Sequence, residues 1–297
     1  FVTGPLHFAA LAIAGMATGT GANLGMLTIQ RTAGLAARDN AERVRLFSWL
    51  GVAPSFSNVI GPVAAGLTID AFGFAAAYGL MALLPIATAV AARRVPVSAP
   101  GPRAPDAPQR TPWSLLQAPG MRRLLTVNWL LSMSWDVHSF AVPLLGHERG
   151  FSASTVGFIL GLFTLSVTLV RLAIPVLAHR LRTSTVMRGA MVGTALVFAA
   201  YPLAPNAWVM GGLAVMLGIT LGSVQPMIMT VLHQLTPHDR HGEALALRSM
   251  AINATSTAMP ILFGASGALV GAAALFWAVG AAVLAGSGLP RRFSSPP

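Results

Sequence analysis

Residues 152–177 read SASTVGFILGLFTLSVTLVRLAIPVL, a run in which Arg171 is the single charged side chain. A helix rises ~1.5 Å per residue, so a run of this length covers the ~30 Å hydrocarbon core of a bilayer. The rest of the chain is similar, since 55% of its 297 residues are apolar and 9% are charged. Soluble domains carry about a quarter charged residues. The composition therefore predicts an all-α, polytopic membrane helix bundle.

Apolar runs of membrane-spanning length occur about nine times along the chain. They cover residues 5–30, 46–69, 73–92, 124–145, 152–177, 187–204, 207–231, 247–269 and 271–289. Glycine and proline inside such runs are tolerated because neighbouring helices satisfy the backbone groups that they free. The last two runs are separated only by the glycine-rich region from Gly264 to Gly271.

The arginines set the expected direction of the chain across the membrane. Seventeen of the 19, Arg240 and Arg248 included, follow the first, third, fifth or seventh run or close the chain, whereas Arg149 lies opposite and Arg171 lies inside a run. Arginine-rich loops are cytoplasmic by the positive-inside rule. We therefore expect a multi-pass protein of a cell membrane, the bacterial inner membrane, with a cytoplasmic C-terminus.

A proline-rich segment and an internal repeat indicate two halves. Residues 94–121 hold seven prolines, which favour an extended cytoplasmic linker between residues 1–93, with three spans, and residues 122–297, with six. A shift of 201 residues pairs Gly66 with Gly267 and the loop residue Glu42 with Glu243. Because an even number of spans separates the partners, the halves run parallel. Two equal halves would require three more spans before Phe1, so an N-terminal truncation is expected.

At this point the sequence resembles the major facilitator superfamily, over nearly its whole length. The small-residue motif of its antiporter branch ends G-P-x-x-G-G. Its positions are filled here by Ser48, Ser57, Gly61, Pro62, Ala65 and Gly66. Small residues let helices approach closely, and proline bends a helix. Ordinary tight helix packing is the alternative reading.

Two further family motifs are present in altered form. Residues 175–184 resemble the loop motif G-x-L-A-D-R-x-G-R-R. Arg180 matches its first arginine, whereas His179 replaces its aspartate and Pro175 and Arg182 replace its two glycines. Residues 19–22 resemble the family's G-x-G-A, but Gly15 stands where an arginine associated with proton coupling is expected. The resemblance implies gating roles for Glu42, Gly61, Pro62, Gly66, Arg171, His179, Arg180 and Glu243. It leaves a coupling proton as an open expectation.

A polar stripe in the fourth span is the main candidate for solute binding. Asn128, Ser132, Asp136 and Ser139 are spaced by four, four and three residues, which places them on one helix face beside Trp135. A carboxylate inside a bilayer is costly unless it faces water or a partner. Asp136 is therefore expected to face a cavity, where it could bind a cationic group or carry a proton. The alternative is an outer location, paired with His138 or Arg149.

Four other polar residues inside spans have two readings each. Arg171 either extends to the lipid headgroups or forms a gate or interhelix pair. The family resemblance places Asn23, Gln30 and Gln225 on cavity-lining helices as substrate contacts, but amides in spans also bond neighbouring helices.

Several other functions are disfavoured by the residues present. His233, His238, His241 and Asp239 straddle a loop with a helix-breaking proline and gain no partners elsewhere, so no metal site is predicted. Without a P-loop, ATP-driven pumping is not expected, and no cofactor is indicated. The chain has no cysteine. Its basic residues alternate with apolar runs, which indicates a lipid bilayer and not nucleic acid as the partner.

The resemblance implies secondary active transport of a small organic solute by alternating access, with export by antiport favoured by the partial motif. The alternatives are uptake of a sugar or organic acid, a polytopic membrane enzyme, and an inactive fragment. An enzyme would need catalytic His, Asp or Glu residues clustered at one membrane face, and the sequence shows no such cluster.

Overall fold

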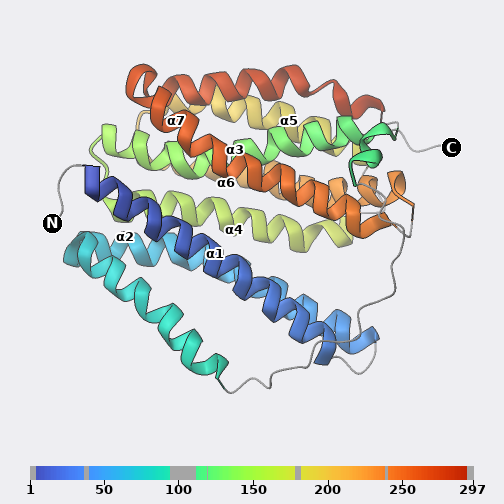
Figure 1. Cartoon of the computed structure of the whole chain (residues 1–297). Helices are drawn as coiled ribbons and strands as arrows, with labels where there is room; N and C mark the ends of the chain where they lie inside the picture. The colour runs from blue at the N-terminus through green and yellow to red at the C-terminus, as the bar shows by residue number, and fades with distance from the viewer. Residues whose placement is uncertain are drawn as a thin grey trace. The chain divides into compact units, whose positions relative to one another are not determined.

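The computed structural model describes residues 5–36, 40–93, 112–118, 120–177, 182–237 and 240–292. Across these residues all regular elements are helical, which confirms the predicted all-α class. The long helices in Figure 1 are α1 (Pro5–Ala36), α2 (Asn40–Ala92), α3 (Met121–Glu148), α4 (Ala153–Leu177), α5 (Thr183–Ala200), α6 (Ala207–Leu235) and α7 (His241–Gly286). Short 3-10 helices are η1 (Pro112–Gln117), η3 (Tyr201–Leu203) and η5 (Leu289–Arg292).

Two glycines interrupt the two longest helices. Gly73 in α2 has φ 79° and ψ 173°, and Gly271 in α7 has φ 76° and ψ 164°. Residues with a Cβ atom rarely adopt this backbone conformation, whereas glycine adopts it at little cost, so glycine suits both breaks. Divided there, the described helices form nine segments, in agreement with the nine predicted runs. The breaks lie 198 residues apart (271 minus 73), three fewer than the shift that aligns the repeat.

Length and hydropathy mark four described stretches as able to cross a membrane: Phe56–Ala91, Ala153–Ile174, Thr183–Leu203 and Ala207–Leu232. The first of these contains the break at Gly73, and Gly271–Gly286 is a shorter apolar helix. Helix α3 falls outside this set because its polar stripe, with Asn128, Ser132 and Asp136, lowers its hydropathy.

The chain divides into two compact units, residues 1–57 with 85–103 and residues 58–84 with 104–297. In the first unit, the side chains described on α1, such as Ile13 and Met16, are exposed. The second unit holds α3 to α7 and the hydrophobic core. Most of the predicted linker, residues 94–111, lies outside the described residues, so the division at 94–121 stays a prediction.

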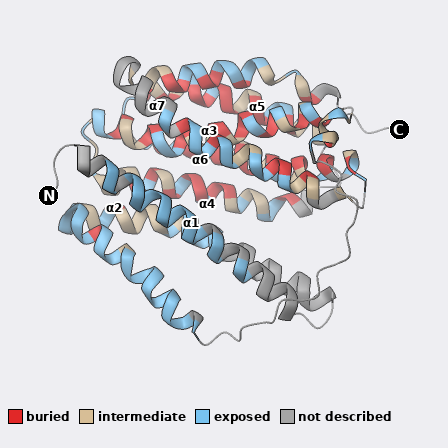
Figure 2. Ribbon diagram, viewed as in Figure 1, coloured by how far each residue is buried: buried red, intermediate tan, exposed pale blue. Residues whose placement is uncertain are grey.

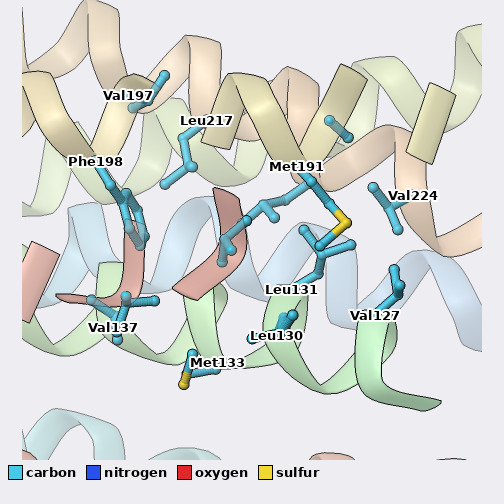
Figure 3. Packing of buried hydrophobic residues seen from close by; sticks show 14 of the residues in the cluster. Val127, Leu130, Leu131, Met133, Val137, Met191, Val197, Phe198, Leu217 and Val224 are labelled. Carbon is cyan, nitrogen blue, oxygen red and sulfur yellow. The ribbon is translucent and has the colours of Figure 1, made fainter. Parts of the chain in front are cut away.

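The core of the second unit is formed by helices α3 to α7. Helix α3 packs against α7, and α6 packs against α4 and α5. Figure 2 shows buried residues concentrated along these helices. In Figure 3, side chains of α3, among them Leu131, lie near Met191 of α5 and Leu217 of α6. At one end of the core, Phe276 stacks on Tyr201 at 4.9 Å and meets Phe198 edge-on at 5.3 Å.

Glycines allow α4 to approach its neighbours closely in this unit. A methyl group on Gly157 would lie 2.4 Å from the carbonyl oxygen of Pro62 in α2, and one on Gly218 of α6 would lie 2.5 Å from that of Phe163. Close backbone approach through small residues is the usual mode of helix association in membranes. Helix α4 is thus held between α2 and α6.

Candidate functional site

The second unit contains an open cavity of about 350 Å³ lined by α2, α3, α4, α6 and α7. Its walls mix apolar side chains, such as Leu131 and Val224, with a concentrated set of polar ones. The polar lining residues, with one tryptophan, are Asn58, Asn128, Ser132, Trp135, Asp136, Arg171, Gln225, Arg248 and Ser256. Helices as apolar as these place such a set in one cavity only where polar groups serve one another or a ligand.

Five of the predicted solute-binding residues line this cavity. Asn128, Ser132, Trp135 and Asp136 come from successive turns of α3, and Gln225 comes from α6. Ser139 is exposed and is not among the lining residues. The side chains of Asn23 and Gln30 lie outside the described residues, so their roles stay predictions.

Arg248 is the residue that links these elements. Its Nε donates to Oδ1 of Asn128 at 3.1 Å, and its Nη2 donates to Oε1 of Gln225 at 2.8 Å. Its side chain is buried, with 8% exposed. The prediction that Arg248 belongs to a cytoplasmic loop is wrong, because α7 begins at His241 and carries the residue into the cavity wall.

Asp136 faces the cavity and is bonded to α7. Its two carboxylate oxygens accept hydrogen bonds from the Ser256 hydroxyl at 3.2 and 3.1 Å. The alternative pairing with His138 or Arg149 is not found: His138 is fully buried against the Phe163 ring, 4.2 Å between centroids. Arg149 donates instead to the carbonyl oxygens of η3 and the residue after it, with Pro202 at 2.5 Å.

Arg171 comes from α4 and lines the same cavity. Its Nε is buried and lacks a hydrogen-bond partner among the described residues. Arg248 lines this cavity as well, so two guanidinium groups border it. The side chain thus contributes positive charge to this cavity.

The predicted gating residues fall into three groups. Gly61, Pro62 and Gly66 lie on α2, where Pro62 and Gly66 contact α4. Glu243 pairs with Arg240 at 2.5 Å, and Arg240 also donates to the Ser114 hydroxyl of η1 at 2.8 Å. His179, Arg180 and the side chain of Glu42 lie outside the described residues. The gating roles of these residues stay predictions.

A carboxylate joins α2 to the N-terminus of α4. The side chain of Asp70 accepts hydrogen bonds from the backbone N–H of Ala153 at 3.0 Å and of Ser154 at 2.7 Å, and from the Ser154 hydroxyl. The first N–H groups of a helix have no partners within the helix, and they carry its positive end. Asp70 therefore caps α4 from a neighbouring helix, a contact that sequence reasoning missed.

We expect Asp70→Ala to lower the melting temperature of the purified protein, because it leaves the α4 N–H groups without their acceptor. Thr68→Ala is the matched control, since the Thr68 hydroxyl donates to Ala64 O of its own helix. Thermal unfolding followed by circular dichroism measures both variants. Equal melting temperatures for the two would contradict a stabilising role for the cap.

The cavity residues of α7 that the sequence did not predict nevertheless follow a helical spacing. Arg248, Ile252 and Ser256 are spaced by four, the same spacing that marks the stripe on α3. Assigning Arg248 to a loop hid this pattern. Asn58, from α2, had no comparable partner in sequence, and it is placed in the lining only by the packing of α2 on α4, where Thr164 donates to its carbonyl oxygen at 2.8 Å.

A polar cavity among helices of membrane-spanning length is typical of polytopic transport proteins. Residues 124–296 match the family model described as Major Facilitator Superfamily. This match covers more than half of the 297 residues, so the chain belongs to the Major Facilitator Superfamily. It is therefore a transporter of the membrane bilayer and not an enzyme.

The solved structures that are similar to this chain include two bacterial transporters. One is a bacterial metal transporter, with 20% identity, a TM-score of 0.62, and coverage of 87% of this chain and 67% of that chain. The other is a bacterial homologue of the iron transporter ferroportin in an inward-facing state, with 19% identity, a TM-score of 0.67, and coverage of 89% and 66%. The chain thus spans about two thirds of each. At these identities the likeness shows the fold. A search of curated proteins gave no match.

Proposed function

We propose that the chain carries out secondary active transport of a small organic solute by alternating access, with the cavity of about 350 Å³ as the solute site. The observation that carries this proposal is the gathering of polar and charged side chains from five helices around that cavity. The volume lies within the range of small-molecule sites. Residues 1–93 and 122–297 would be the two moving halves, joined by residues 94–121.

We further propose that transport is export by antiport, with a proton as the coupling ion. The partial antiporter motif on α2 supports export. Two of its residues, Pro62 and Gly66, lie where α2 closely contacts α4. Asp136 is the candidate proton carrier, since it is the acidic residue that lines the cavity in the described part of the chain.

A metal ion is the second candidate cargo, since both similar structures are named as metal or iron transporters. The cavity here is lined by two arginines and one aspartate, a net charge of +1 from two positive charges and one negative. Positive charge disfavours a bare divalent cation. An organic solute is therefore the stronger proposal.

Transport can be measured with the complete protein in liposomes. We expect saturable movement of a small organic solute, faster when an opposing proton gradient is imposed and abolished when a protonophore collapses it. Lipid vesicles without protein provide the control. A rate of solute movement that is unchanged by every imposed ion gradient would contradict secondary active transport.

Membrane orientation is tested by single cysteines, because the chain has none of its own. We expect Thr183→Cys, before α5, to react with a membrane-impermeant maleimide only from the cytoplasmic side. Asn206→Cys, before α6, should react only from outside. Reversed labelling of the two would contradict the predicted cytoplasmic C-terminus.

A further inference from the structure

The cavity is rich in hydrogen-bond donors that lack acceptors. The guanidinium of Arg248 has five N–H donors. Two of them go to the oxygens of Asn128 and Gln225, and the described residues supply no others, so three remain. The Nε of Arg171 is also buried without a partner in the described part of the chain.

Asn128 adds a further free donor. It is 2% exposed, and its Oδ1 accepts from Arg248. Because a guanidinium only donates, this contact requires the amide oxygen to face Arg248, and the Nδ2 group is left over. That Nδ2 is buried and has no partner among the described residues. The orientation of the amide is thus dictated by the arginine.

The acceptors in the cavity do not match these donors. Asp136 is the carboxylate of the lining in the described residues, and its oxygens accept from the Ser256 hydroxyl. Among the described side chains, the ion pair found is that of Arg240 with Glu243, away from the cavity. The buried Arg248 has only neutral partners, Asn128 and Gln225, and Arg171 brings a second positive charge to the same cavity. An uncompensated charge is unfavourable away from water, so a negatively charged group in the cavity would stabilise both guanidinium groups.

We propose that the cavity binds a small organic anion whose carboxylate or phosphate group is held by Arg248 and Arg171. The proposal rests on the transport function above and names its substrate class. Planar guanidinium groups hold such oxyanions through paired hydrogen bonds, which a lysine does not reproduce. Asn128 on α3 and Gln225 on α6 are positioning residues, because their hydrogen bonds fix the orientation of the planar Arg248 guanidinium.

Binding is tested apart from transport, on the complete protein in a neutral detergent that contributes no phosphate. The anionic probes are succinate, citrate, benzoate and glycerol 3-phosphate. Their neutral counterparts are succinamide, benzamide and glycerol, and Mn²⁺ is the cation probe. We expect at least one anion to bind in calorimetry at least tenfold more tightly than its neutral counterpart, and Mn²⁺ not to compete with it.

Variants identify the residues responsible. Arg248→Gln should weaken anion binding at least tenfold, and Arg248→Lys should give an intermediate loss because it keeps the charge without the fork. Arg171→Gln tests the second guanidinium if the Arg248 variants do not fold. Arg188→Gln is the control, since it removes the same charge from an exposed position on α5.

Equal binding of neutral probes, displacement of the anion by Mn²⁺, absence of binding by all four anions, or unchanged affinity in both arginine variants would overturn the proposal. Anion binding without any transport would leave this inference standing and would contradict the proposed function instead. The two failures are therefore distinguishable.

Discussion

Gly66→Ala should sharply reduce the amount of folded protein, although alanine is normally the better helix former by up to about 1 kcal/mol. The added methyl group would lie 2.4 Å from the Ala153 carbonyl oxygen and 2.9 Å from Ser154 Cα. Both contacts are backbone atoms, so α2 and α4 would have to separate. Overpacking of this kind costs about 1–3 kcal/mol or more. Fluorescence-detected size-exclusion chromatography and thermal unfolding measure the loss.

Gly61→Ala is the matched control on the same helix and in the same motif. A methyl group there meets no atom within 4 Å. This variant should fold as well as the wild type or better. If both variants behaved alike, the contact of α2 with α4 would not be the reason for the glycine at position 66.

Asp136→Asn should lower transport at least tenfold while leaving the protein folded and anion binding undiminished. The change removes the negative charge that opposes an anion in the cavity, and it also removes the proposed proton carrier. A loss in turnover without a loss in affinity therefore separates coupling from solute binding. The measurements are initial transport rates in liposomes and calorimetric affinity for the anionic probe.

Glu148→Gln is the control for this variant, because it makes the same chemical change at an exposed position on α3. Its transport rate should equal that of the wild type. Unchanged transport by Asp136→Asn would reduce Asp136 to a structural acceptor for Ser256.

The helical segments and part of the cavity could be predicted because both follow from local spacing. Apolar run lengths predicted the segments, and the four-residue spacing on α3 brought Asn128, Ser132 and Asp136 to one face. Arg248 could not be placed in this way, because an arginine at the start of a run resembles a loop charge. Its partner Asn128 lies 120 residues away in sequence, and only packing brings them together.

Asp70 was missed for a related physical reason. A lone acidic residue between two apolar runs has the appearance of an ordinary solvated turn. Its partners, the first N–H groups of α4, are backbone atoms more than 80 residues later in the sequence. Every residue except proline has a backbone N–H group, so the sequence does not show which of them bind a distant side chain. Contacts of a side chain with a distant helix end are therefore found only in the folded structure.

In the alternating-access cycle proposed above, the Asp70 cap would also affect the balance between the two states. Helix α4 carries Arg171 into the cavity at the opposite end from the cap. If the cap is made in one state and broken in the other, its strength sets the ratio of their populations, and this ratio changes exponentially with free energy. Weakening the cap would then shift the populations of the two states while the solute contacts stay intact. A single exposed carboxylate, far from the solute, would in that case set the balance between the two states of the transport cycle.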